Sequence, residues 1–249
     1  MDDTTTGLSD PGRLDGTLAV VTGATRGIGE AVAVDLAARG CHVIAVGRKV
    51  EALEALDDRI RGVNGMATLV PIELTDGPGV DRLGASIHER WGKLDIFVGN
   101  AGLLGRIAPL AHVPAKVWQE TFDVNVSANW RLIRTLDPVL RAATAARCVF
   151  LTSGAATKLR PNWGPYSISK AALNALVATY AAEVANTPIR ANLFSPGPIR
   201  TLMRAAAVPG EDPMTLPTPE DVAPYIAAMC APSFTRNGAT WSFPERDFV

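Results

Sequence analysis

The chain has 249 residues, of which 47% are hydrophobic and 20% are charged. This composition is typical of a globular protein with a sizeable core and excludes a disordered chain or a coiled coil. The 24 Lys and Arg residues against 25 Asp and Glu give a net charge of −1, which argues against nucleic acid or an anionic membrane as the principal partner.

The cysteines are sparse and far apart, and no C-x-x-C pair occurs: Cys41, Cys148 and Cys230. This pattern argues against a disulfide framework and fits a reducing compartment. The histidines show no metal-ligand spacing, so no metal is expected: His42, His88 and His112. Because the N-terminus is polar and acidic, and no apolar run reaches the roughly 20 residues of a membrane span, we expect a cytoplasmic protein.

Short β-branched runs alternate with helical patterns along the chain, as at Ile28, Val32 and Leu36. The predicted strands are Leu18–Thr22, His42–Val46, Thr68–Ile72, Leu94–Val98, Cys148–Thr152, Ile189–Phe194 and Thr240–Phe243. This alternation predicts one α/β domain over 1–249, with a parallel sheet of about seven strands and helices on both faces. We expect residues 1–14 to be a flexible tail. The proline-rich segment 196–219 follows a strand end, so we predict a substrate-binding lid there; the alternative is a surface loop without function.

Three glycines follow the first strand at G-x-x-x-G-x-G spacing: Gly23, Gly27 and Gly29. Glycines there permit a tight turn and let backbone N–H groups approach a pyrophosphate at the start of a helix. The alternative is an ordinary strand-to-helix turn. Placed on the first strand-turn-helix unit, the cluster favours a dinucleotide.

The end of the second strand distinguishes between two forms of that cofactor. An acidic residue there would bind the adenosine ribose and repel a 2′-phosphate. The chain instead has Arg48 and Lys49, with Arg26 in the glycine loop. Guanidinium groups suit phosphate, so the sequence favours NADP(H) over NAD(H). The alternative is that Arg48 and Lys49 form only a solvated helix start.

Ser153, Tyr166 and Lys170 lie in the stretch LTSGAATKLRPNWGPYSISK. Tyr166 and Lys170 are one helical turn apart, so their side chains share a face. A neighbouring ammonium is expected to lower the pKa of the phenol towards the neutral range, where proton transfer is effective. Ser153 could donate a hydrogen bond to a substrate oxygen.

These motifs together resemble the short-chain dehydrogenase/reductase family over nearly the whole chain. The matching elements are TGATRGIG (Thr22–Gly29), NAG (Asn100–Gly102), Asn125, Ser153, YSISK (Tyr166–Lys170) and SPGPIRT (Ser195–Thr201). The resemblance implies a Rossmann-like doubly wound sheet and NAD(P)-dependent chemistry at a carbonyl or alcohol. Within the family, the chain looks most like bacterial 3-oxoacyl-carrier-protein-reductase-like members.

The resemblance assigns Tyr166 as general acid/base, Lys170 as the group that lowers its pKa and binds the nicotinamide ribose, and Ser153 as the donor to the substrate oxygen. It makes Asn125 the anchor of a water-mediated proton relay, although a buried Asn can also simply brace the backbone. Asn100 is equally open to a structural or a cofactor role. The implied cofactor contacts are Gly23, Thr25, Arg26, Gly27, Ile28, Gly29, Arg48, Glu73, Leu74, Asn100, Ala101, Gly102, Tyr166, Lys170, Pro196, Gly197, Ile199 and Thr201.

Two departures from the family pattern stand out. Glu73 replaces a common Asp after the third strand, and the C-terminus lacks the Gly-Gly that often closes the last strand. The second departure puts a tetramer in doubt, while a homodimer through the helices around Trp118–Ala143 and Pro165–Ala185 is expected. An apolar substrate pocket is predicted from residues that could equally be core: Leu103, Leu104, Trp163 and Met203.

The leading hypothesis is an NADPH-dependent reductase of a ketone or 3-oxoacyl-like carbonyl. A nucleotide-sensing or scaffolding protein without turnover is the first alternative, and a dehydratase or epimerase that retains its cofactor is the second. The intact set Asn125, Ser153, Tyr166 and Lys170 favours the reductase.

Overall fold

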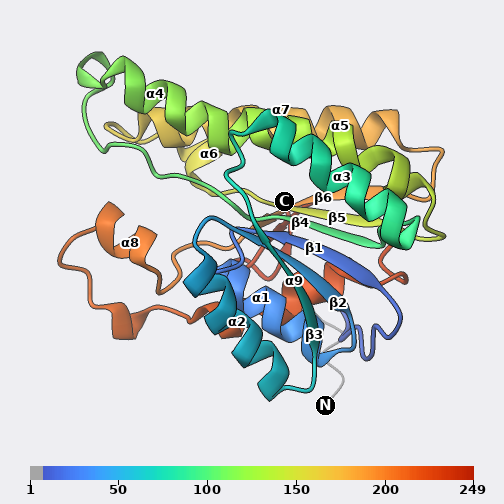
Figure 1. Ribbon diagram of the computed structural model, residues 1–249. Coiled ribbons are helices and arrows are strands. Elements are labelled where there is room, and N and C mark those ends of the chain that lie inside the picture. The colour runs from blue at the N-terminus through green and yellow to red at the C-terminus, as the bar shows by residue number, and fades with distance from the viewer. Residues whose placement is uncertain (1–7) are drawn as a thin grey trace.

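The computed structural model describes residues 8–249 and has a central sheet between two layers of helices (Figure 1). The strand order is β3-β2-β1-β4-β5-β6-β7-β8. The strands are β1 (Leu18–Thr22), β2 (His42–Gly47), β3 (Met66–Pro71), β4 (Ile96–Gly99), β5 (Arg147–Leu151), β6 (Arg190–Ser195), β7 (Thr240–Ser242) and β8 (Asp247–Phe248). The α-helices are α1 (Gly27–Ala38), α2 (Val50–Gly62), α3 (Gly77–Trp91), α4 (Ala115–Phe122), α5 (Ala128–Arg141), α6 (Ala155–Lys158), α7 (Gly164–Glu183), α8 (Leu202–Ala207) and α9 (Pro219–Cys230).

The predicted doubly wound α/β sheet is confirmed, with one addition. All seven predicted strands are present and parallel to their neighbours, and their bounds match the prediction or differ by one or two residues. The eighth strand, β8, pairs antiparallel with β7. Sequence periodicity could not indicate β8, because two residues are too few to show an alternation.

Alternate side chains of each inner strand enter two separate cores. From β1, Ala19 and Val21 pack on the side of α1, α2 and α9, whereas Leu18 and Val20 pack on the side of α3, α5 and α7. Both faces of β1 are fully buried, which explains the continuous apolar run LAVVT. The result is a rigid platform whose carboxyl edge carries the loops.

The order of the strands reverses at β1, since β2 lies on one side of it and β4 on the other. Loops leaving β1 and β4 therefore diverge towards opposite faces and leave a crevice at the carboxyl edge of the sheet, where α/β proteins bind ligands. The glycine loop and the NAG segment lie at this point.

The predicted N-terminal tail and the predicted lid both contain ordered structure. Residues 1–7 of the predicted flexible tail lie outside the described residues. The rest of that segment packs on the domain: Leu8 and Leu14 are buried, and the backbone N–H of Leu14 donates to Arg39 O at 2.7 Å. The predicted lid contains α8 and a 3₁₀ turn, η3 (Pro213–Thr215). In Figure 1, α8 stands apart from the sheet, opposite α4 and α6.

The predicted helix around Trp118–Ala143 is two helices joined by a π-helical turn, η2 (Asp123–Ser127). The one around Pro165–Ala185 is α7. Within residues 8–249, no helix combines the length and hydrophobicity that a bilayer span requires.

Candidate active site

The glycine loop is built so that β1, α1 and the segment after β4 approach one another closely. Gly23 has φ +62°, and a Cβ on Gly29 would lie 2.4 Å from Gly23 O and 2.3 Å from Asn100 Nδ2. Asn100 in turn donates from Nδ2 to Thr22 O at 2.9 Å and Gly23 O at 3.1 Å. Asn100 therefore has the structural role that we considered, since it holds the two diverging loops together.

The N-terminus of α1 is available to an anion. Its N-cap residue, Arg26, makes no side-chain hydrogen bond to the helix, whereas Thr218 caps α9 with a complete capping box. Uncapped N–H groups at a helix start attract negative charge. Gly23 and Gly27 carry no side chains and are both at positive φ, so backbone N–H groups of the loop are open to a ligand. The glycine loop and the uncapped start of α1 together fit the pyrophosphate of a dinucleotide.

The segment after β6 closes over the glycine loop. A Cβ on Gly27 would lie 3.3 Å from Thr201 Cγ2, and Thr201 caps α8 by accepting from the N–H of Arg204. Gly197 is at φ +72°, and a Cβ there would overlap Pro244. Ile199 has its side chain buried in the core, so only its backbone can face a ligand.

The predicted adenosine end lies where β2 and β3 finish. Arg48 is exposed and forms an ion pair with Glu73, with 3.5 Å between Nη1 and Oε2. Leu74 is buried in the core, which leaves its backbone for any contact. Thr25 lies against the end of β2, because a Cβ on Gly47 would be 2.6 Å from Thr25 Cγ2. Arg26 is exposed in the glycine loop between β1 and α1.

Three of the four predicted catalytic side chains lie at the ends of β5 and α7. Ser153 follows β5, and its hydroxyl is close enough to that of Tyr166, in the first turn of α7, to act on the pKa of the phenol. Lys170, one turn later, is buried and donates from Nζ to Leu151 O at 2.6 Å. Its ammonium lies 5.9 Å from the centroid of the Tyr166 ring.

The fourth, Asn125, sits fully buried in the π-helical turn η2. Its amide accepts from Leu103 N at 2.7 Å and donates to Leu103 O at 2.9 Å. A Cβ on Gly102 would lie 3.3 Å from Asn125 Oδ1 and 3.5 Å from Lys170 Nζ. The Asn125 side chain thus braces the backbone beside the lysine, and π-helical turns often mark functional sites.

A comparison with known families agrees with this arrangement. Residues 17–212 match the family described as short chain dehydrogenase. The chain belongs to the short-chain dehydrogenase family. It is therefore an NAD(P)-dependent oxidoreductase, as the sequence resemblance predicted.

Relatives and solved structures of the family cover almost the whole chain. The oxidoreductase YciK of Escherichia coli K12 is 34% identical over 232 residues, which are 92% of each protein. A short chain dehydrogenase from Pseudomonas syringae has 35% identity and a TM-score of 0.91, covering 94% of this chain and 98% of that one. A Shigella flexneri 2a homologue complexed with NADP has 33% identity and a TM-score of 0.86, with 92% and 97% covered.

One electrostatic expectation for this short-chain dehydrogenase was wrong. Lys170 does not lower the pKa of Tyr166 below its ordinary value. Burial of the phenol raises that pKa, and the Ser153 hydroxyl opposes the rise only in part. Burial also lowers the pKa of Lys170 to about 8, because the ammonium is removed from water and, within residues 8–249, forms no ion pair.

Two positioning residues escaped the sequence reasoning. Ser169 accepts from Asn125 Nδ2 and donates to Tyr166 O, both at 2.9 Å. Asn129 donates from Nδ2 to Asn125 O at 2.9 Å. Ser169 lies inside the YSISK motif, so its position next to Tyr166 was visible, but its link to Asn125 depends on how α7 packs against η2.

The predicted substrate-pocket residues are only partly brought together. The ring of Trp163 meets that of Tyr166 edge-on, with 6.2 Å between centroids, and Leu103 is held by Asn125. Leu104 is half-buried in the same segment, while Met203 lies on α8 in the lid.

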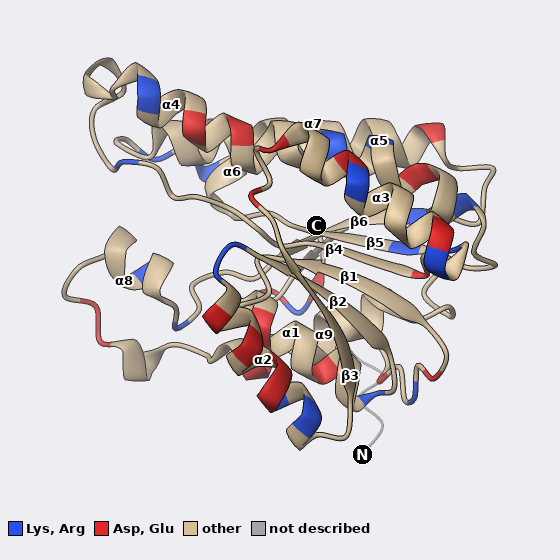
Figure 2. Cartoon of the chain, in the orientation of Figure 1, with Lys and Arg blue, Asp and Glu red and all other residues tan. Residues whose placement is uncertain are grey.

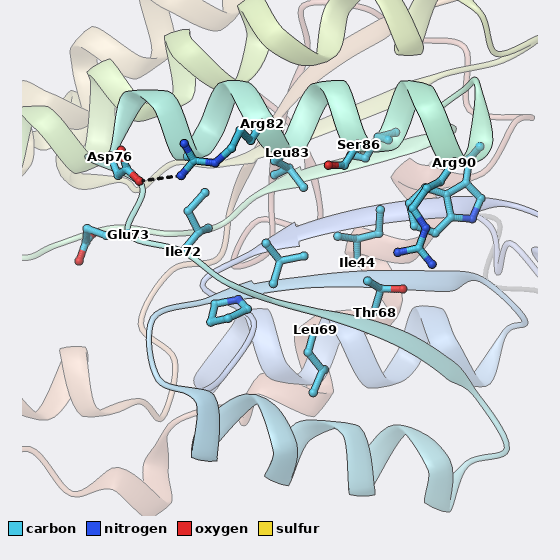
Figure 3. Close-up of a pocket in the computed structure, with 15 residues that line it drawn as sticks. Ile44, Thr68, Leu69, Ile72, Glu73, Asp76, Arg82, Leu83, Ser86 and Arg90 are labelled. Carbon is cyan, nitrogen blue, oxygen red and sulfur yellow. Dashed lines mark ion pairs between the residues drawn. The ribbon is translucent and has the colours of Figure 1, made fainter.

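A separate groove lies at the edge of the sheet, away from Tyr166 and the glycine loop. It has a volume of about 490 Å³ and runs between the edge strand β3 and α3 (Figure 3). Its lining includes Ile72, Leu83 and Trp91, with Arg82 paired to Asp76 at its rim. Glu73 is the one predicted site residue that lines it. Among the described residues, no three His, Cys, Asp or Glu side chains are grouped to hold a metal.

Proposed function

We propose that this protein is an NADPH-dependent reductase that converts the carbonyl group of a small molecule into an alcohol. The observation that carries the proposal is the grouping of Ser153, Tyr166 and Lys170, in which the Lys170 ammonium lies 5.9 Å from the phenol ring and the Ser153 hydroxyl acts on the pKa of that phenol. This group lies at the same edge of the sheet as the uncapped start of α1.

A nicotinamide cofactor held at this edge would supply a hydride, that is a proton with two electrons, for the carbonyl carbon. Tyr166 supplies the second proton to the carbonyl oxygen, and the C=O bond becomes CH–OH. Its raised pKa keeps the phenol protonated at neutral pH, which suits a proton donor. Ser153 can hold the oxygen by a hydrogen bond while negative charge develops there.

Lys170 assists Tyr166 through its charge. With a pKa of about 8, it is mostly protonated at pH 7 and can stabilise the phenolate that remains after proton transfer. Asn125 fixes the neighbouring backbone through Leu103 and Ser169. The main-chain carbonyl oxygen of Asn125 accepts a hydrogen bond from Asn129 Nδ2. This oxygen is the proposed end of the relay that returns a proton from solvent to Tyr166.

Replacing Tyr166 by Phe tests the proposal. The variant should bind NADPH as the wild type does, yet lose turnover of a ketone panel by about 10³-fold or more, because the proton donor is gone. Retained turnover would place the chemistry elsewhere. Loss of nucleotide binding as well would indicate a damaged fold.

Preference for NADP(H) over NAD(H) is the second part of the proposal. Arg48, Lys49 and Arg26 give the adenosine end positive charge, with Glu73 as the nearby acid. The Shigella flexneri homologue complexed with NADP supports this assignment. Arg48→Ala should weaken NADPH far more than NADH in a calorimetric titration; equal losses would contradict the role of Arg48.

For the substrate, we propose a ketone or 3-oxoacyl-like carbonyl compound that binds beneath the 196–219 lid. We also propose a homodimer through α5 and α7 or a homotetramer, which sedimentation would distinguish. The three cysteines, all buried and free, are consistent with a cytoplasmic location.

A further inference from the structure

Two loop segments form one wall beside the proposed reacting groups. We call residues 106–110, after β4, and 158–163, between Ser153 and Tyr166, the entrance wall. The N–H of Ala108 donates to Asn162 O at 3.0 Å. A Cβ on Gly164 would lie 2.6 Å from Leu110 Cδ1. The two segments are therefore in direct contact next to Tyr166.

The backbone of the entrance wall is strained. Leu159 has φ +43° and Asn162 has φ +71°. Asparagine tolerates this left-handed region, but a leucine rarely adopts it. Core packing does not compensate, since Leu159 is 63% exposed. Strained residues held near reacting groups commonly serve a ligand.

The charges of the entrance wall are all positive and uncompensated. Arg106, Lys158 and Arg160 are exposed, and within residues 8–249 none of them makes an ion pair or a side-chain hydrogen bond. Neither wall segment contains an acid. The methylene chain of Lys158 folds against the residue after Ser153, because a Cβ on Gly154 would be 3.8 Å from Lys158 Cε.

The predicted lid, whose helix α8 lies opposite α6 in Figure 1, differs from the entrance wall. In the lid, Leu202 and Met214 are each 72% exposed, and Arg204 is neutralised by Glu211 at 2.5 Å. Figure 2 shows α8 across from α6 and the basic loop positions near it. A molecule between the two sides would meet apolar groups from the lid and cations from the wall.

From this asymmetry we infer that the substrate carries an anionic group, a carboxylate or a phosphate, on an apolar body. The anionic group pairs with Lys158 and Arg160, with Arg106 adding charge at the rim, while the apolar part lies against Leu159, Leu202 and Met214. This inference rests on the proposed reductase function, because it assigns the substrate class of the same site.

The test uses 7-oxo-octanoate and its methyl ester, which differ in charge but share the ketone and the chain. Binding of each to the protein with NADP⁺ is measured by calorimetry, independently of turnover. The acid should bind about 10-fold more tightly than the ester, and the difference should shrink as salt is added.

The double variant Lys158→Met, Arg160→Gln should bind the acid about 10-fold more weakly and leave the ester unchanged. Arg82→Gln, an exposed cation on α3 away from the cleft, is the matched control and should preserve the preference. Equal binding of acid and ester, no binding of either, or an unchanged preference in the double variant would overturn the inference. A preserved preference without NADPH oxidation by any ketone would instead contradict the proposed function.

Discussion

The proposed nucleotide side and the proposed substrate side of the site are built in different ways. At the nucleotide side, Gly29 leaves no room for even one carbon atom beside Gly23 O and Asn100. At the substrate side, Leu159, Leu202 and Met214 are mostly exposed. Among residues 8–249, the side chains of Lys158 and Arg160 form no ion pair or hydrogen bond. Backbone and close contacts define the first region, whereas exposed side chains define the second. We therefore expect substitutions to be severe at the first region and selective at the second.

The largest effect is expected for Gly29→Ala. Its Cβ would lie 2.4 Å from a backbone oxygen that cannot move without displacing the loop. NADPH affinity, measured by calorimetry, should fall by about 100-fold or more, or the variant should not fold. Gly62→Ala is the control, since nothing lies within 4 Å of its Cβ and its affinity should not change. Normal binding by Gly29→Ala would refute the close approach.

Asn125 joins the segment after β4 to α7, so Asn125→Ala should affect both stability and turnover. The substitution leaves the N–H and C=O groups of Leu103 without their side-chain partner. We expect the free energy of unfolding to fall by about 2–4 kcal/mol and turnover to fall with it. Gln119→Ala, which loses one exposed hydrogen bond to Asp123, should change stability by less than about 1 kcal/mol in the same urea titration.

Lys170 offers a pH-dependent test. Its pKa falls from an ordinary 10.5 to about 8 on folding, so the unfolded chain binds the proton more tightly. The cost of burying the ammonium is fully present below pH 8 and is relieved as pH rises from about 8 to 10.5. Lys170→Met should therefore be more stable than the nucleotide-free wild type by about 1–3 kcal/mol at pH 7. This gain should shrink towards pH 10; a constant difference would mean that the lysine titrates normally.

The smallest effect is expected at the exposed end of the nucleotide side. If Arg48 binds a 2′-phosphate as proposed, Glu73 competes for it, but both side chains are largely exposed and the pair is 3.5 Å apart. Glu73→Gln should tighten NADPH binding by no more than about 5-fold and leave NADH unchanged. If both nucleotides weaken equally, Glu73 contacts the nucleotide instead of restraining Arg48.

The features of the site that could be predicted from the sequence differ between these regions. The glycine spacing and the Tyr166–Lys170 interval depend on local geometry, so the nucleotide loop and the face shared by these two side chains could be predicted. The link from Asn125 to Ser169 joins residues 44 positions apart, and no local pattern contains it. The assigned roles of these residues remain predictions.

The sequence by itself determined the α/β class, the seven parallel strands and the family, because period, turn chemistry and motif order are local properties. Only the tertiary structure decided the pKa direction of Tyr166, the added strand β8 and the contact between the two segments of the entrance wall. Burial and long-range packing produce these features, and both depend on which distant residues come together when the chain folds.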